Sequence, residues 1–404
     1  DPELTLARTN SLSGQFIFDD QTHFLRDDFP HDAILGLGEF AAEHWNPKLK
    51  EEGLSLTRYK FENYIAELWY RSDTKMALLS GAPFDDPTWW LLHNDQIVAA
   101  RDMINDFAGT TRMLGHSVIT PKQDGWMDEA ERAMSELKPN SWKSYTIGDP
   151  LSPSKYPWRL DDEKVMYPFY EKSLKAGINT ICIHKGLLPP DYETSFKGVW
   201  KYATVDDVPK AAKDWPEMNF VIYHAALRPF LELPDQAWKE FEESGGYIKW
   251  ASDLARIPQE HGVSNVYAEL GSTFANSAVA HPRFCAAFIG TLVGGMGADH
   301  VVWGSDTVWY GSPQWQIEAM RRLEVPEDMQ KKYKLPALGG ANSLTKQAIF
   351  GLNSARIYGL SMNEATNMPD LPNFSEDKIA GLAAKFREAG GGPSNKRFGY
   401  TRKA

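Results

Sequence analysis

The sequence predicts a parallel (β/α)8 barrel of the TIM-barrel class, and two observations support this prediction. Short runs of β-branched and apolar residues recur along the chain, and amphipathic segments with helical periodicity separate most of them. A length of 404 residues suits one large α/β domain or two ordinary domains. The structural alternative is an open doubly wound sheet. It normally carries a glycine-rich phosphate loop after its first strand, and residues 19–24 (DDQTHF) do not form one.

Eight segments have the composition of buried strands. We place them at residues 16–24, 75–81, 112–119, 142–148, 179–184, 219–224, 265–270 and 300–306. Helices are predicted at Asp124–Leu137, Asp161–Ala176, Val205–Trp215 and Arg283–Met296. We expect the acidic run at 161–163 to open the second of these helices, because anionic side chains are favoured at the positive end of the helix dipole.

The spacing of the strands predicts one domain over residues 1–404, with the barrel at about 15–360. Two long insertions interrupt it after strands 1 and 8, at residues 24–74 and 307–343, and residues 361–404 form a C-terminal extension. Long loops at the C-terminal face of a barrel usually build a substrate pocket or an interface. The chain has 14 tryptophans, several of them in these loops. Whether those aromatics line a pocket or a subunit interface stays open here.

Composition excludes several function classes. A formal net charge of -11 argues against binding nucleic acid or an anionic membrane surface. The two cysteines, Cys182 and Cys285, exclude a disulfide scaffold, a Cys-based zinc site and an iron–sulfur cluster. No apolar run reaches the roughly 18 residues needed to span a bilayer. The residues 36–43 lack the preceding strand that a dinucleotide loop requires, so no nucleotide cofactor is expected.

The placement of the histidines points to a metal site. His23, His184 and His224 each end a different predicted strand, and Asp306 ends the last one. In a parallel barrel these positions converge at the C-terminal mouth, where active sites lie. Imidazole nitrogen and carboxylate oxygen are ligands of zinc, manganese and iron. His300 begins a strand, which assigns it to the opposite, structural face.

Two further side chains are predicted metal ligands. Alternation with a period of two places Asp19, Gln21 and His23 on the same face of the first strand, pointing into the barrel. Glu269 ends the seventh strand and reaches the same mouth, unless it forms a buried ion pair with a neighbouring cation. Two metals can share such a set, with Glu269 or Asp306 bridging them.

Four other residues are candidate substrate contacts. His116 lies late in the third strand and Lys143 in the fourth, where its ammonium can meet a substrate carboxylate. Trp309 and Tyr310 belong to the insertion that follows the last strand, above the predicted mouth.

Taken together, these motifs resemble the amidohydrolase superfamily. Asp19, Gln21 and His23 on strand one, His184 and His224 on strands five and six, and Gly-Ser-Asp at residues 304–306 are similar to its amidohydrolase-related group. That group contains metal-dependent decarboxylases, hydrolases and hydratases. Residues 346–360 resemble its terminal helix, which packs beneath the barrel. The resemblance covers about residues 15–360 and implies the TIM-barrel fold and a divalent metal.

One departure from the family pattern leaves more than one function possible. The family has His-x-His on strand one, whereas this chain has Gln21-Thr22-His23. An amide oxygen is a weak ligand for a lone zinc ion. The Gln-Thr-His triplet with Glu269 resembles the dinuclear iron or manganese–iron hydroxylases on the same barrel. These include enzymes similar to the isobutyrate hydroxylase and the platensimycin-pathway hydroxylase.

Three function classes therefore remain, and Gln21 together with Glu269 favours the first of them. The first is a dinuclear iron, or manganese–iron, oxygenase that hydroxylates a C–H bond of a small carboxylate or apolar substrate. The resemblance implies electrons from a partner such as a ferredoxin and its reductase. The second is a mononuclear zinc or manganese hydrolase or decarboxylase, with Asp306 as general base toward water or proton donor to carbon, assisted by His224. The third is an inactive partner subunit of such an enzyme.

The remaining expectations concern context. We expect a small-molecule substrate, a homo- or hetero-oligomer and a cytoplasmic location. The first residue is Asp1 instead of Met, so we expect that the original N-terminus is missing and that a removed signal peptide stays possible.

Overall fold

The structure, a computed structural model, describes residues 11–12, 14–229, 234–366, 368–372 and 374–388. Eight parallel strands form one sheet in chain order from β1 to β8, which confirms the predicted barrel. The strands are β1 (Phe18–Thr22), β2 (Met76–Leu79), β3 (Met113–Val118), β4 (Ser141–Tyr145), β5 (Thr180–His184), β6 (Asn219–Tyr223), β7 (Val266–Glu269) and β8 (Val301–Val302). Seven lie within segments that the sequence predicts as strands, and β4 begins one residue before its predicted segment.

The barrel closes between its first and last strands. Thr22 forms a parallel bridge with Thr307, and the Asp20 N–H donates to the Trp303 carbonyl over 2.9 Å. β8 itself has two residues, so most of this closure is made by the loop that follows it. The closure matters for the site because it sets the ends of β1 and β8 side by side.

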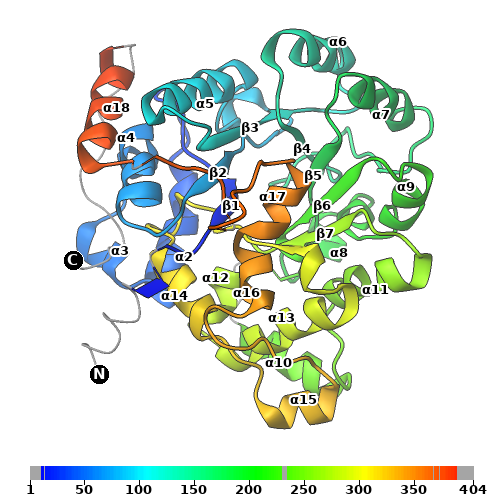
Figure 1. The fold of residues 1–404 in the computed structure, drawn as a ribbon. Coiled ribbons are helices and arrows are strands. Elements are labelled where there is room, and N and C mark those ends of the chain that lie inside the picture. Colours follow the sequence, from blue (N-terminus) through cyan, green and yellow to red (C-terminus); the bar gives the residue numbers. More distant parts are fainter. Residues whose placement is uncertain (1–10, 13, 230–233, 367, 373, 389–404) are drawn as a thin grey trace.

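Helices surround the sheet (Figure 1). Those that follow β2 to β7 are α5 (Asn94–Ala108), α6 (Trp126–Arg132), α7 (Met166–Lys175), α8 (Tyr192–Ser195), α9 (Val208–Asp214), α10 (Pro234–Glu243), α11 (Ala251–His261), α12 (Thr273–Ala278) and α13 (Pro282–Met296). A π-helical turn at Ala133–Leu137 extends α6, so the predicted helix at Asp124–Leu137 is present from Trp126.

One predicted helix start is wrong. The acidic run at 161–163 does not open a helix, and α7 begins at Met166. Asp161 pairs with Arg159, and the Asp162 carboxylate accepts hydrogen bonds from the backbone N–H groups of Lys164 and Val165, each over 3.1 Å. Such local side-chain to backbone bonds stabilise a turn in place of a helical start.

The two insertions are largely helical. The first contains α2 (Leu35–His44), α3 (Lys48–Glu52) and α4 (Phe61–Ile65), which a π-helical segment at Ala66–Tyr70 continues. The second contains α14 (Gln314–Arg322) and α15 (Glu327–Tyr333). In the C-terminal extension, α18 (Glu376–Glu388) packs on α4, where the Phe386 and Phe61 rings stack 4.1 Å apart. Residues 389–404 lie outside the described part of the chain.

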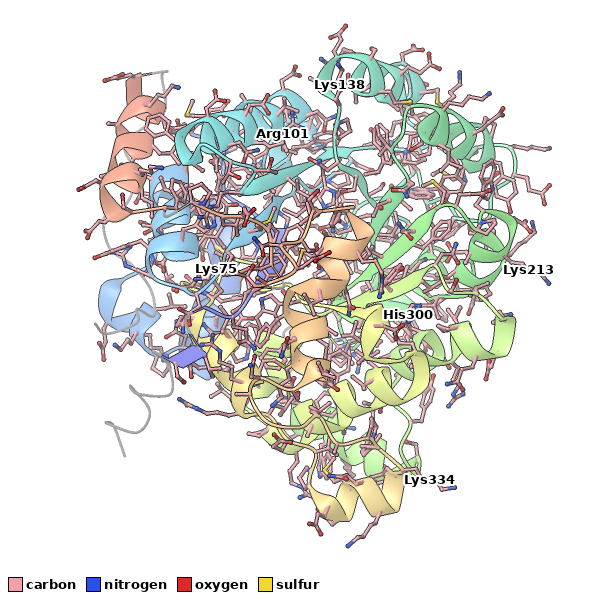
Figure 2. All side chains as sticks on the ribbon, in the orientation of Figure 1. Lys75, Arg101, Lys138, Lys213, His300 and Lys334 are labelled. Carbon is pink, nitrogen blue, oxygen red and sulfur yellow. The ribbon has the colours of Figure 1, made fainter. Side chains whose placement is uncertain are left out.

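A helical segment covers the N-terminal end of the barrel, as the family resemblance implies. It consists of α16 (Leu344–Gln347), a π-helical turn at Ala348–Leu352 and α17 (Asn353–Ile357), which cross the near end in Figure 1. Beyond it, the Tyr358 ring lies 5.6 Å from that of Phe18 on β1. His300 lies at this end, as predicted, and its Nε2 lies 3.1 Å from the Ser264 carbonyl (Figure 2).

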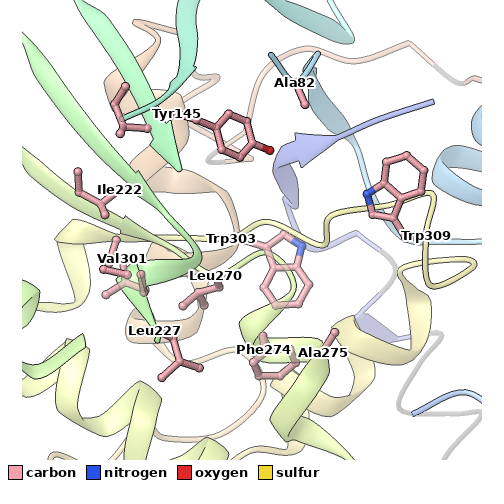
Figure 3. Close-up of a cluster of buried hydrophobic side chains, with 14 of the residues drawn as sticks. Ala82, Tyr145, Ile222, Leu227, Leu270, Phe274, Ala275, Val301, Trp303 and Trp309 are labelled. Carbon is pink, nitrogen blue, oxygen red and sulfur yellow. The ribbon is translucent and has the colours of Figure 1, made fainter. Parts of the chain in front are cut away.

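Apolar packing fills the space between the strands and the outer helices. Figure 3 shows Trp303, which directly follows β8, beside Phe274 of α12 with their rings 5.3 Å apart. Both side chains are fully buried. This rigid packing fixes the loops after β7 and β8, which carry functional side chains. In the described ranges of the chain, no helix is long and apolar enough to cross a membrane.

Candidate active site

The three predicted histidine ligands and the predicted aspartate ligand follow or end four different strands and meet at one cavity. His23 follows β1, His184 ends β5, His224 follows β6, and Asp306 lies in the loop after β8. All four line a cavity of about 290 Å³ at the C-terminal mouth of the barrel. Gln21, Trp309 and Tyr310 line it as well, so two of the four predicted substrate contacts also face it.

His23 and Asp306 form the closest polar pair of predicted ligands at the cavity floor. His23 Nε2 lies 3.2 Å from Asp306 Oδ1, and His23 Nδ1 lies 2.7 Å from the Ser80 carbonyl oxygen. A carbonyl oxygen only accepts hydrogen bonds, so Nδ1 carries the hydrogen and Nε2 of the neutral ring presents a lone pair. This contact is favourable when a proton on Nε2, or a cation held between the two side chains, joins the nitrogen to the carboxylate.

Asp306 is oriented by two further donors. Ser272 Oγ donates to Asp306 Oδ2 over 2.5 Å, and Trp309 Nε1 donates to Oδ1 over 3.2 Å. Burial alone would raise the pKa of Asp306, but its contacts with His23, His224 and Ser272 bring that pKa below its ordinary value. Asp306 is therefore a carboxylate at neutral pH.

The backbone is unusual at three of these positions. His224, Ser272 and Asp306 have φ values of 64°, 57° and 58°, in the left-handed region that residues other than glycine rarely adopt. Such conformations cost about 1–3 kcal/mol each and are concentrated at functional sites. Here each one turns the chain sharply after a strand and aims a polar side chain at the cavity.

His184 and His224 lie together on the other side of the cavity. Their ring centroids are 4.4 Å apart, and the Tyr145 ring stacks on His184 at 4.3 Å. Burial lowers the pKa of both histidines, that of His224 to about 4. His224 Nδ1 lies 2.8 Å from the Gly271 carbonyl, which leaves Nε2 as the lone-pair nitrogen of a neutral ring.

Glu269, a predicted metal ligand, is fully buried and is not among the residues that line the cavity. Its carboxyl oxygens accept hydrogen bonds from the backbone N–H groups of His224, over 3.1 Å, and Gly271, over 2.5 Å. Burial raises the pKa of Glu269 well above its ordinary value, which favours the neutral acid. A Cβ at position 304 would stand 1.6 Å from Glu269 Oε1, so the packing requires the glycine of the Gly-Ser-Asp motif.

The first strand departs from the predicted alternation. Gln21 and His23 line the cavity, but the Asp19 carboxylate instead accepts hydrogen bonds from the Ser305 backbone and hydroxyl. The pairing of β1 with β2 shifts register between Asp19 and Thr22, and such an irregularity changes which side chains share a face. Gln21 Oε1 is buried without a hydrogen-bond partner, and Gln21 Nε2 lies 3.3 Å from His23 Nε2.

Lys143 and His116 lie in the barrel interior and do not line the cavity. Lys143 Nζ stands 3.6 Å from the Tyr223 ring centroid, and burial lowers the pKa of Lys143 to about 8. His116 Nε2 lies 2.9 Å from Tyr223 Oη, and its Nδ1 lies 2.9 Å from Ser141 Oγ. Their role in substrate binding stays a prediction.

Sequence reasoning missed several residues of the cavity. Tyr145 had a usable signal, because alternation on β4 places it on the same face as Lys143. Ser272 had no such signal, because its position depends on a positive backbone φ that the residue type does not predict. Most of the apolar wall also went unpredicted, since its residues come from the first insertion and from connecting segments: Ile34, Leu37, Phe84, Leu91 and Leu151.

The donor chemistry of the floor suits a divalent cation. Bonds of about 2.0–2.2 Å place two ligands of one metal about 3 Å apart, as His23 Nε2 and Asp306 Oδ1 are. A metal-ligating histidine usually donates a hydrogen bond from its other ring nitrogen, and His23 Nδ1 has such a partner in the Ser80 carbonyl oxygen. Across the described residues, however, no three His, Cys, Asp or Glu side chains are gathered into a ready-made metal site. His23 and Asp306 are thus the preformed part, and His184 and His224 are further donors on the same cavity.

Comparison with protein families decides the broader assignment. A family model described as "Amidohydrolase" matches residues 57–360, which include His184, His224 and Asp306. The chain belongs to the amidohydrolase family. This confirms the resemblance seen in the sequence and makes the protein an amidohydrolase-fold enzyme. Gln21 and His23 precede the matched residues. No curated protein matches this chain.

Solved structures of low sequence identity also resemble this chain. An uncharacterised TIM-barrel protein from Bordetella bronchiseptica is 12% identical with a TM-score of 0.51, covering 85% of this chain and 98% of its own. The 2,6-dihydroxybenzoate decarboxylase from Rhizobium is 13% identical with a TM-score of 0.49, covering 86% and 99%. A dihydroxybenzoic acid decarboxylase from Polaromonas, solved with manganese and an inhibitor, is 14% identical with a TM-score of 0.49, covering 87% and 98%. The first of these supports the barrel fold of this amidohydrolase.

Proposed function

We propose that this amidohydrolase uses one divalent cation, held by His23 and Asp306 with His184 or His224, to hydrolyse or decarboxylate a small molecule. One observation carries the proposal. His23 Nε2 and Asp306 Oδ1, a nitrogen and an oxygen that can both ligate a metal, lie 3.2 Å apart at a cavity that both other histidines line.

A divalent cation at this floor supplies Lewis-acid activation of a substrate carbonyl or carboxylate. The protein residues supply orientation and proton transfer. Asp306 is ionised at neutral pH, so it can accept the proton that an attacking water loses and return it to the leaving group. In a decarboxylation, Asp306 would first take up a proton from solvent; the C–C bond to the carboxylate then breaks, CO2 leaves, and Asp306 transfers that proton to the substrate carbon.

His224 complements Asp306 in the same cavity. Its pKa of about 4 keeps the ring neutral above that pH, and the Gly271 carbonyl fixes which nitrogen carries the hydrogen. Nε2 can therefore coordinate or accept a proton. Tyr145 and the cavity wall hold the substrate and exclude water from the reacting bond.

A second candidate is the dinuclear hydroxylase, and a specific observation favours it. Gln21 Oε1 is buried without a hydrogen-bond partner, and it lies near Glu269 Oε1, since both oxygens crowd the place of a Gly271 Cβ, at 2.3 and 2.7 Å. A second cation there would give Gln21 Oε1 a partner and could also bind Glu269 Oε1. In that reaction dioxygen, two electrons and two protons convert a C–H bond to C–OH and water, with a ferredoxin and its reductase as the electron source.

Elemental analysis of the purified protein, its visible spectrum and its oxygen consumption with a chemical reductant separate these functions. The favoured proposal predicts about one zinc or manganese per chain and no substrate-dependent oxygen uptake. Two iron ions, or one manganese and one iron, with oxygen uptake would instead establish the hydroxylase. A protein that holds no metal after reconstitution would be the inactive partner subunit. Oligomeric state, the reductase partner and a cytoplasmic location remain predictions.

A further inference from the structure

The cavity has a polar floor and an apolar wall, and the two come from different parts of the fold. The polar groups stand at the ends of the barrel strands and in the loops that follow them, as described for His23, His184, His224 and Asp306. The wall comes from the first insertion and the loops after β2, β4 and β5, with Ile34, Leu37, Phe84, Trp89, Leu151 and Leu187. Polarity is thus confined to one end of the space.

No lysine or arginine is among the described residues that line the cavity. Among the cations near in sequence to the lining residues, Lys143 is buried in the barrel interior and does not line the cavity, and two others are occupied elsewhere. Lys185, which follows His184, is fully buried and pairs with Asp207 over 2.8 Å. Arg26 donates to the carbonyl oxygens of Trp90 and Thr88. The wall therefore has no side chain that can neutralise an anion.

The size of the cavity limits the substrate further. A volume of about 290 Å³ is roughly twice the ~150 Å³ of an apolar cavity that binds benzene. Aromatic surfaces from Phe84, Trp89 and Trp309 suit a flat ring, and the exposed Leu151 side chain lies where the lining reaches solvent.

We propose that the substrate is a compact molecule with one polar reacting group, which faces the floor, and an uncharged apolar body, which the wall holds. This inference rests on the proposed function for the place of the reacting group. A second anionic group at the far end of the body would be buried among apolar side chains without a partner. Since the desolvation of an unpaired carboxylate is costly, we expect such a group to weaken binding by at least about 100-fold.

The test compares two ligands of the same shape by isothermal titration calorimetry on the protein as purified. Both p-toluate and terephthalate are flat para-substituted benzoates, and they differ in one methyl group against one carboxylate. We expect p-toluate to bind at least about 100-fold more tightly than terephthalate. The neutral p-cresol should bind as well, because the wall recognises its body.

Two variants at one position provide the internal control. Leu151→Lys places an ammonium at the cavity wall and should selectively strengthen terephthalate binding by about 10-fold or more. Leu151→Met keeps the wall apolar and should preserve the preference for p-toluate. The Leu151 side chain is 54% exposed, so both variants are expected to fold.

Several results would overturn the inference. They are equal or tighter binding of terephthalate, failure of both p-toluate and p-cresol to bind at millimolar concentration, and an identical ligand preference in the Lys and Met variants. Metal content is measured on the same samples. If the protein holds no metal but still prefers p-toluate, the proposed function fails and the inference about the substrate body stands. If metal is bound and the preference for p-toluate is absent, the inference about the substrate body fails and the proposed function stands.

Discussion

At the scale of single residues, Asp306 is the centre of the site. Its two carboxylate oxygens contact His23, Ser272 and Trp309, and Ser272 Oγ also lies 2.5 Å from Tyr310 Oη. A residue with this many directed partners has one available orientation. The sharp backbone turn at Asp306 itself adds to this, because strain of that kind persists only where the surroundings fix it.

We predict that Ser272→Ala lowers metal affinity or turnover by about 10–100-fold, because the Asp306 carboxylate loses a donor that orients it. Metal titration and steady-state kinetics measure the effect. Ser277→Ala is the matched control, since Ser277 is also buried but hydrogen-bonds to the Thr273 carbonyl within α12. Equal effects of the two substitutions would show that Ser272 does not orient Asp306.

Gly304 gives a prediction about packing. A Cβ there would collide with the Glu269 carboxyl, which backbone N–H groups hold in place, so Gly304→Ala should lower the free energy of unfolding by about 1–3 kcal/mol or more. Chemical denaturation measures this. Gly340→Ala, where no atom lies within 4 Å of the added Cβ, should change stability little. A Gly304→Ala protein as stable as the control would mean that Glu269 moves freely.

At the scale of elements, the strands were predictable and the loops were not. All eight strands coincide with segments predicted from apolar runs, β4 beginning one residue early, because a strand buried on both faces has a strong compositional signal. The histidines at their ends were therefore placed correctly at the mouth. Glu269 was expected there too, but the backbone N–H groups of His224 and Gly271 hold its carboxyl below the cavity floor. No sequence pattern reports such contacts.

The junction of β1 and α17 gives a prediction about pH. Ser354 of α17 donates to the buried Asp20 carboxyl over 2.7 Å, and burial raises the pKa of Asp20 to about 8. The unfolded group titrates near 3.8, so its contribution to stability is complete below about pH 4 and is lost as the pH rises to about 8. Asp20→Asn should therefore be more stable than the wild type at pH 9, with a smaller difference at pH 5.

Urea denaturation at both pH values measures this difference. Asp102→Asn is the control, because Asp102 is exposed on α5 and forms a surface pair with Arg101. A wild type that is equally stable at pH 5 and 9, with no gain from Asp20→Asn, would show that the buried Asp20 does not titrate in this range.

At the scale of the whole molecule, the side chains proposed to take part in the reaction and those proposed to select the substrate come from different parts of the fold. The strand ends fix the polar floor, while the first insertion and several loops form the wall above it. The 14 tryptophans, ambiguous in the sequence, are partly explained by this arrangement. Trp89 and Trp309 line the cavity, whereas Trp303 packs between the barrel and α12.

We propose that His23 and Asp306 form a single metal site to which Glu269 does not contribute. The most direct test is Mn²⁺ titration of the metal-free protein, comparing the wild type with Asp306→Asn and Glu269→Gln. We expect one Mn²⁺ per chain, a loss of affinity of at least about 10–100-fold in Asp306→Asn, and wild-type affinity in Glu269→Gln. Binding of two ions, or an equal loss of affinity in Glu269→Gln, would contradict the claim.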